Sequence, residues 1–284
     1  MKKITNGHLS QPAGSELGKN SNYDKSYNPQ RLYPILRADK REEIGIDPNA
    51  LPFFGFDCWN HYEVSWLNEK GKPIVATAEI YYSCMSEFII ESKSLKLYFN
   101  SLNDCKFKSV EEVELIIKKD LEQAINFEVN VLLHPLNAAN LLSVAARFEG
   151  ESIDDIDVEC TQYIVQPAYL TTQDERVSET LCSDLLKSNC LVTNQPDWGS
   201  VQITYTGNKI NRAGLLQYLV SFRNHNEFHE QCIERIFIDL MNYCKPDELT
   251  VYGRYTRRGG LDINPYRSTK KIDAVHLNRR LARQ

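Results

Sequence analysis

The 284-residue sequence lacks any long run of apolar residues. A helix that crosses a membrane needs roughly 20 consecutive apolar residues, so this absence argues against an integral membrane protein. The opening Met-Lys-Lys is not followed by the apolar run of a secretory signal. Together these absences predict a soluble protein that works in the cytoplasm and has no membrane partner.

Closely spaced metal-binding cysteines are also missing. Eight cysteines are present, but no two form the C-x-x-C pair on which structural zinc sites and thioredoxin-like motifs rely. His225 and His229 stand four residues apart, but the H-E-x-x-H motif of zinc proteases is absent because the residue directly after His225 is asparagine and not glutamate. We therefore expect no metal, and most thiols should pack as small core residues in a reducing compartment.

The chain has neither of the common nucleotide-binding loops and no overall excess of positive charge. The absence of G-x-G-x-x-G and G-x-x-x-x-G-K-[ST] argues against a Rossmann or P-loop site. A net charge of −5 argues against nucleic-acid binding by the whole chain. Basic residues gather only in residues 254–284, which hold nine Arg or Lys and two Asp. This segment is either a basic tail or a set of arginines directed at a phosphorylated ligand.

The sequence does contain a pattern of strands and helices that occurs twice. Residues 1–45 show no periodicity and predict an extended N-terminal arm. In residues 46–150, a hairpin around NEKGK precedes a helix from Ser92, a helix opened by the capping box Ser109-Val-Glu-Glu, and the strand FEVNVLL. In residues 151–284, strands that flank Cys190 precede the helices RAGLLQYLVSFR and EFHEQCIERIFIDLMNYC and the strand LTVYGRYT. This order predicts a duplicated α+β protein with two β-β-α-α-β modules.

Two segments combine chemically active side chains with turn formers. SNCLVTNQPDWG, residues 188–199, holds the thiol of Cys190 and the carboxyl group of Asp197 on one loop. FIIESKSLKLYFNSLN, residues 88–103, ends a strand at Glu91 and opens a helix that Ser92 and Ser94 can cap. The start of this helix is either a phosphate site, with free backbone N–H groups, or a capped surface helix with solvated lysines.

These segments, together with NEFHEQC and RYTRRGGLDINPYRS, closely resemble the signature motifs of the NADPH-dependent 7-cyano-7-deazaguanine reductases. These are the nitrile reductases of queuosine biosynthesis. The resemblance is to the long, two-module form and extends from SYNPQRLYP almost to the C-terminus. It implies tandem tunnelling-fold modules that associate into a barrel-forming homodimer. It also implies reduction of 7-cyano-7-deazaguanine to 7-aminomethyl-7-deazaguanine with two NADPH per nitrile, without direct binding of nucleic acid.

The resemblance further implies roles for individual residues. Cys190 is the nucleophile that forms a covalent thioimide with the nitrile, and Asp197 donates a proton to the nitrile nitrogen. The substrate-binding residues are Ile90, Glu91, Ser92, Phe228, His229 and Glu230, and the NADPH-binding residues are Ser92, Lys93, Arg258 and Gly259. In this set Glu91 and Glu230 offer carboxylates to the N–H edge of the base, and Phe228 lies against its ring.

Two other interpretations remain open. One is a non-reductase tunnelling-fold enzyme acting on a purine or pterin, such as a cyclohydrolase, although zinc-dependent cyclohydrolases need a Cys/His ligand set that is missing here. The other is a non-catalytic protein that binds RNA through the basic C-terminal segment. That protein would bind RNA in a salt-sensitive way and would not turn over a purine nitrile.

Overall fold

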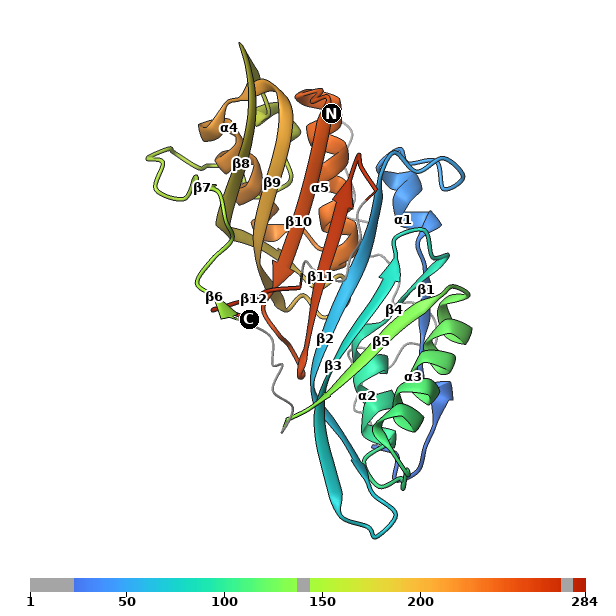
Figure 1. The fold of residues 1–284 in the computed structure, drawn as a ribbon. Helices are drawn as coiled ribbons and strands as arrows, with labels where there is room; N and C mark the ends of the chain where they lie inside the picture. Colours follow the sequence, from blue (N-terminus) through green and yellow to red (C-terminus); the bar gives the residue numbers. More distant parts are fainter. Residues whose placement is uncertain (1–22, 137–143, 272–277) are drawn as a thin grey trace.

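The computed structural model describes residues 23–136, 144–271 and 278–284 and has a mixed α+β architecture (Figure 1). Its main feature is an eight-stranded sheet in the order β5-β3-β2-β11-β10-β9-β8-β7. These strands are β2 (Phe54–Leu67), β3 (Pro73–Ser83), β5 (Val129–Pro135), β7 (Glu151–Ser152), β8 (Thr172–Asn189), β9 (Pro196–Ile210), β10 (Glu248–Tyr255) and β11 (Leu261–Ser268). The prediction of an α+β fold is confirmed.

The first half of the chain forms the hairpin and the two helices that the sequence predicts. The NEKGK turn joins β2 to β3, and the side chain of Asn68 accepts hydrogen bonds from two backbone N–H groups within it. After β4 (Phe88–Ile90), α2 (Ser92–Ser101) and α3 (Val110–Ile125) lead into β5. Ser109 caps α3 by accepting from the N–H of Glu112, while the carboxylate of Glu112 accepts from the N–H of Lys108.

The second half follows the same order. The strands β8 and β9 precede α4 (Arg212–Ser221), the short 3₁₀ helix η3 (Phe222–Asn224) and α5 (His229–Tyr243), which leads into β10. Cys232, Ile236 and Leu240 recur every four residues along α5 and are fully buried, so they form the apolar side of this helix. The chain then returns through β11, which pairs antiparallel with β2 over eight residue pairs and so joins the two halves in one sheet.

Both pairs of helices lie on one face of the sheet (Figure 1). Side chains alternate between the two faces of a strand, so Asp57 and Trp59 of β2 share the face that the helices cover. One apolar core lies under α2 and α3 and the other under α4 and α5. The opposite face holds a smaller aromatic cluster that includes Phe56, Tyr252 and Tyr266. The seam between β2 and β11 therefore lies between the two helix pairs.

The segment predicted as an extended arm contains short regular elements in its described part, and residues 1–22 lie outside the described residues. These elements are η1 (Pro29–Arg31), β1 (Pro34–Leu36) and α1 (Ala38–Glu43). The strand β1 pairs antiparallel with β4, directly before Glu91. This segment therefore packs along the edge of the site described below.

The remaining short elements lie outside the eight-stranded sheet. They are β6 (Val144–Ala145), β12 (Arg280–Leu281), which pairs with β6, and η2 (Pro167–Tyr169). Among the described residues, no helix combines the length and the apolar character that a membrane crossing needs.

Candidate active site

A narrow cavity lies where the two halves of the chain meet, and most of the residues predicted for the site line it. The space, including solvent at its mouth, is about 330 Å³. Eight lining residues were predicted: Ile90, Ser92, Cys190, Asp197, Phe228, His229, Glu230 and Arg258. Three were not: Trp59, Ile89 and Ile263. The cavity is therefore built by both halves together.

A tight turn holds Cys190 at the end of β8. The N–H of Cys190 donates to the carbonyl of Gln195 (2.8 Å), and Asn194 adopts a left-handed conformation with φ of 57°. The side-chain amide of Asn226 donates to the carbonyl oxygen of Cys190 and to the side chain of Asn194, which ties the turn to the segment before α5. Cys190 is only 3% exposed. The turn formers noted in the sequence thus fix the thiol against the cavity.

Asp197 lies at the start of β9 and contacts two cationic or titratable side chains. Its Oδ1 atom is 2.8 Å from Nη1 of Arg258, and its Oδ2 atom is 3.3 Å from Nε2 of His229. The Arg258 nitrogen lies within ion-pair distance but is not aligned for a hydrogen bond. The structure thus brings the predicted proton donor together with one predicted substrate residue and one predicted cofactor residue.

His229 is the first residue of α5, and its ring is fixed from one side. It stacks on the ring of Tyr255, with centroids 3.9 Å apart and planes 5° from parallel. Its Nδ1 atom has no hydrogen-bond partner among the described residues. Tyr255 was not predicted for the site, because an aromatic residue in a strand is more often simply core.

Glu230 carries a buried carboxyl group whose titration is strongly shifted. It is 2% exposed, and its Oε1 atom has no hydrogen-bond partner among the described residues. Burial, with the negative charge of Asp57 adding to it, raises the pKa of Glu230 to about 8, against the opposing charges of Arg37 and Arg267. The group is therefore an unpaired acceptor facing a cavity, which is a feature of binding sites.

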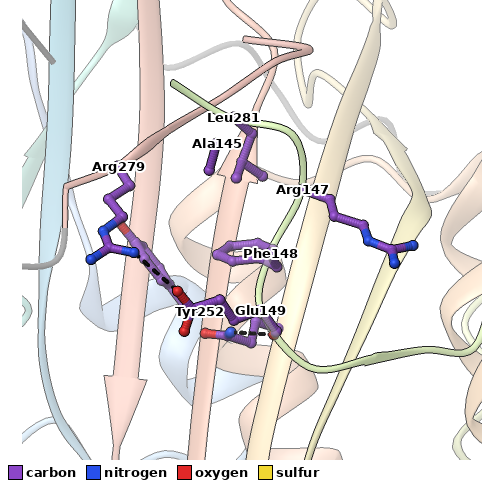
Figure 2. A pocket seen from close by; sticks show the side chains of 8 residues that line it. Ala145, Arg147, Phe148, Glu149, Tyr252, Arg279 and Leu281 are labelled. Atoms are coloured by element: carbon purple, nitrogen blue, oxygen red, sulfur yellow. Dashed lines mark hydrogen bonds and ion pairs between the residues drawn. The ribbon is translucent and has the colours of Figure 1, made fainter. Parts of the chain in front are cut away.

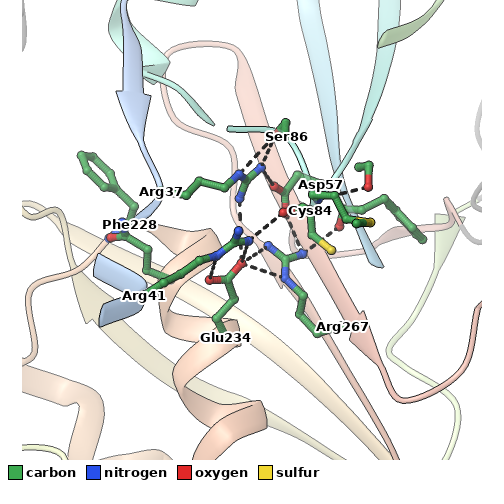
Figure 3. A network of polar contacts seen from close by, with 12 residues as sticks. Arg37, Arg41, Asp57, Cys84, Ser86, Phe228, Glu234 and Arg267 are labelled. Atoms are coloured by element: carbon green, nitrogen blue, oxygen red, sulfur yellow. Dashed lines mark hydrogen bonds and ion pairs between the residues drawn. The ribbon is translucent and has the colours of Figure 1, made fainter. Parts of the chain in front are cut away.

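A buried network of arginines and carboxylates, shown in Figure 3, supplies the charges that act on Glu230. Arg267 contacts both Asp57 (2.9 Å) and Glu234 (2.8 Å). Arg37 pairs with Asp57, and Arg41 pairs with Glu234. Three guanidinium groups thus face two carboxylates, which leaves one positive charge in excess. The network joins the N-terminal segment, β2, β11 and α5 at one point.

The charges of this network set the titration of its acids. Burial alone would raise the pKa of Asp57 and of Glu234, but the neighbouring arginines, Arg267 foremost, hold both pKa values below the ordinary range. Both carboxylates are therefore ionised at neutral pH. Removing one partner would leave an uncompensated buried charge, which is strongly destabilising.

Glu91 has a structural task as well as its predicted binding role. It is the N-cap of α2, and its two carboxylate oxygens accept hydrogen bonds from the N–H groups of Lys93 and Ser94, both at 2.8 Å. The expectation that Ser92 and Ser94 cap this helix is wrong, because the longer side chain of Glu91 reaches the same N–H groups from the residue before. Those groups are consequently not free to bind a phosphate. Burial raises the pKa of Glu91 despite these hydrogen bonds.

A second pocket adjoins the cavity and carries the residues predicted for NADPH. The space, including open solvent at its mouth, is about 700 Å³, and its lining residues are Ser92, Lys93, Lys96, Thr193, Gln195, Arg258, Gly259 and Leu261. Ser92 and Arg258 line both spaces. Gly259 has φ of 62°, a conformation that a side chain would strain. The three basic residues give this pocket the charge that a phosphorylated ligand needs.

A third pocket lies on the sheet face opposite to the one that α2 to α5 cover, and it is unrelated to the predicted site (Figure 2). Figure 2 shows Phe148 and Tyr252 in it, with Arg279 and Glu149 beside them. None of the predicted site residues lines this pocket. In the part of the chain that the structure describes, no three His, Cys, Asp or Glu side chains gather in a way that could hold a metal ion.

Comparison with known proteins gives consistent matches. The family model described as "Nitrile reductase, 7-cyano-7-deazaguanine-reductase N-term" matches residues 23–133, and the one described as "QueF-like protein" matches residues 196–274. The similar proteins include relatives that carry the name "NADPH-dependent 7-cyano-7-deazaguanine reductase". The one from Legionella pneumophila (strain Lens) is 64% identical over 95% of both chains. The one from Acidovorax ebreus (strain TPSY) is 53% identical over 97% of this chain and 100% of its own.

Proposed function

This chain belongs to the family of NADPH-dependent 7-cyano-7-deazaguanine reductases, and from this membership we propose that it reduces the nitrile of 7-cyano-7-deazaguanine to an aminomethyl group in queuosine biosynthesis. The observation that best supports this is the convergence of Cys190, Asp197, His229 and Glu230 around one cavity. Reduction of this nitrile requires a nucleophile, a proton donor and a group that recognises the base. The cavity offers a candidate for each.

In the proposed mechanism, the thiolate of Cys190 attacks the nitrile carbon. A sulfur–carbon bond forms, one carbon–nitrogen π bond breaks, and its electron pair takes a proton from Asp197, which yields a neutral thioimide. The thioimide accepts hydride at carbon more readily than the nitrile does. Formation of the covalent intermediate therefore divides one difficult step into two easier ones. The carbon–sulfur bond then breaks, sulfur leaves as the thiolate, and the resulting imine is reduced to the amine.

The second proton of the reaction also needs a path. His229 lies 3.3 Å from Asp197 and is held in place by its stack on Tyr255. We assign to it the return of a proton to Asp197 between the two reductions. Phe228, the residue before His229, is assigned to the wall of the base pocket together with Ile90.

For base recognition, Glu230 is the principal acceptor. Its unpaired Oε1 atom faces the cavity, whereas both oxygens of Glu91 already accept backbone hydrogen bonds. A carboxylate can accept two adjacent N–H groups of the deazaguanine in one plane. Glu91 would contribute through the geometry of β4 and α2 and through the lone pairs that its cap leaves free.

The basic pocket fits NADPH by the chemistry of its donors. Lys93, Lys96 and Arg258 suit phosphate groups, and the glycine at 259 allows close approach of the backbone. When bound, NADPH supplies two hydrides, one for each two-electron reduction of the nitrile. Ser92 and Arg258, which line both spaces, would hold cofactor and substrate against each other.

We also propose the larger architecture that goes with this function: two tunnelling-fold modules, residues 46–150 and 151–284, in a homodimer that closes barrels. Among the described residues, the helices α2 to α5 cover one face of the sheet, and the aromatic cluster around Phe56 and Tyr252 lies on the other, which supports a sheet that packs further. All eight cysteines are unpaired, as suits the reducing cytoplasm in which we place the enzyme.

The test is to mix the pure protein with 7-cyano-7-deazaguanine and NADPH and to follow the loss of NADPH absorbance with the mass of the product. The expected result is 7-aminomethyl-7-deazaguanine with two NADPH consumed per nitrile. Absence of turnover with metal in the purified protein would favour a cyclohydrolase. Absence of turnover with salt-sensitive RNA binding would favour an RNA-binding protein.

A further inference from the structure

Trp59 lines the cavity and carries a buried hydrogen-bond donor without a partner among the described residues. It lies on β2 opposite Ile263 of β11 and Ile80 of β3, and it is 1% exposed. Its ring packs in the core under α2 and α3, but Trp59 and Ile263 also line the cavity. The indole Nε1–H has no hydrogen-bond partner among the described residues.

Such an unpaired donor is unusual and calls for a partner. Nearly all buried polar groups in proteins are hydrogen-bonded, and a buried group without a partner is costly. The indole nitrogen only donates, so the missing partner must be an acceptor. Glu230 Oε1 is unpaired in the same cavity and only accepts when ionised. The cavity thus lacks both an acceptor for Trp59 and a donor for Glu230, which a ligand with both functions would supply.

The proposed substrate has this pattern. The pyrimidine edge of a deazaguanine carries a carbonyl oxygen, a ring N–H and an amino group in succession. Glu230 accounts for the two N–H donors, but the carbonyl oxygen beside them needs a donor from the protein. Several other side-chain donors at the cavity lie near carboxylates: Nε2 of His229 and Nη1 of Arg258 are close to Asp197, and the hydroxyl of Ser92 is 3.5 Å from Glu91. Nδ1 of His229 is unpaired among the described residues as well, but we assign that ring to the return of a proton to Asp197. Trp59 is therefore our candidate for the donor to the carbonyl oxygen.

We propose that the indole N–H of Trp59 donates to the carbonyl oxygen of the deazaguanine and so selects a 6-oxo over a 6-amino base. This inference rests on the proposed function and adds a specificity residue to it. An adenine-like base with an amino group at this position would meet the indole with N–H against N–H. A contact of this kind rejects the wrong base because it leaves buried polar groups unpaired.

The first experiment removes each side of the contact in turn, the donor on the protein and the acceptor on the base. In a Cys190→Ala background, which prevents the covalent step, Trp59→Phe should weaken binding of 7-cyano-7-deazaguanine roughly 5- to 150-fold by calorimetry. The analogue that lacks the carbonyl oxygen should lose a similar factor with the intact Trp59, and Trp59→Phe should weaken its binding little further. The proposal is overturned if the substitution and the missing carbonyl oxygen weaken binding independently, so that their factors multiply. It is also overturned if Trp59→Phe binds the substrate with the affinity of the protein that keeps Trp59.

Trp66→Phe is the matched control. Trp66 lies on the same strand and is as buried, but it does not line the cavity. It should leave binding within about twofold, which separates loss of the N–H from a general loss of aromatic volume. If Trp59→Phe fails to fold, binding of the analogue to the Cys190→Ala protein still tests the contact. If no donor of the protein reaches the carbonyl oxygen, the analogue without this oxygen should bind as tightly as the substrate, which would contradict the proposal.

A second readout observes the donor itself. The sequence has three tryptophans, so ¹⁵N-indole labelling gives three N–H resonances, which single Trp→Phe variants assign. Substrate should shift the Trp59 resonance downfield, and the analogue without the carbonyl should not. If the Trp59 resonance does not move when substrate is bound, this proposal is refuted but the proposed function is not. Failure of the wild type to reduce the nitrile refutes the proposed function, so the two failures are distinguishable.

Discussion

Arg258 lies 2.8 Å from Asp197, and it lines both the cavity of Cys190 and the basic pocket of Lys93. One guanidinium therefore contacts the proposed proton donor and lines the pocket proposed for NADPH. A cofactor phosphate would compete with the Asp197 carboxylate for the same cation. Events in the two spaces should for this reason be linked through Arg258.

The assignment of Cys190 predicts a covalent adduct. Incubation with 7-cyano-7-deazaguanine in the absence of NADPH should add the mass of the nitrile to the wild-type protein, as intact mass spectrometry would detect. Cys190→Ala should show no adduct and no turnover. Cys232→Ala, which removes a fully buried thiol of α5, is the control and should still form the adduct. An adduct that maps to Cys182 or Cys232 contradicts the assignment.

Asp197→Asn should bind substrate but slow turnover about 100-fold or more, on the usual scale for a lost general acid. The amide keeps the size of the carboxyl group, so the contacts to Arg258 and His229 should change in charge and not in packing. Single-turnover kinetics separates binding from chemistry. Asp184→Asn, on β8 and outside both spaces, should be near wild type. Wild-type turnover of the Asp197 variant would remove it from the mechanism.

Sequence motifs locate the cavity well because each motif lies at a junction of elements. Cys190 follows β8, Glu91 caps α2, and His229 begins α5, so their side chains gather where strands and helices end. The turn formers and capping residues that mark such junctions are local in sequence. Local patterns therefore predict where these residues lie along the fold.

The buried charges could not be predicted in this way. Arg254 and Arg267 belong to the segment interpreted as a basic tail or a phosphate-binding cluster, yet they are 1% and 0% exposed. Arg267 meets Asp57, which is 210 residues away, only because β11 pairs with β2. In a sequence, charged residues indicate solvent exposure. Their partners become visible only when the pairing of the two halves is known.

The basic pocket predicts a preference for NADPH over NADH. Arg258→Gln should raise the KM for NADPH about tenfold or more, because a charge-assisted contact is lost, and should change the KM for NADH much less. Arg257→Gln is the matched control, since Arg257 stacks on Tyr62 (4.0 Å) and does not line the pocket. Steady-state kinetics with both cofactors decides the matter. Equal losses for NADPH and NADH would mean that Arg258 does not contact the distinguishing phosphate.

Glu230 predicts that substrate binding releases a proton. In the free protein burial raises its pKa to about 8, so the carboxyl group is mostly protonated at pH 7. Substrate N–H donors favour the carboxylate, so binding lowers this pKa, and affinity should rise from pH 6 to 8 and level off above. The stability of the folded protein changes with pH in the opposite direction. Because the pKa of Glu230 is raised in the folded state, its contribution to stability is complete at pH below 4.5 and is lost as pH rises through about 8. Calorimetry in buffers of different ionisation enthalpy measures the proton release, and thermal unfolding against pH measures the second effect. Glu230→Gln should abolish both dependences; a variant that keeps the pH profile of binding would assign it to His229 instead.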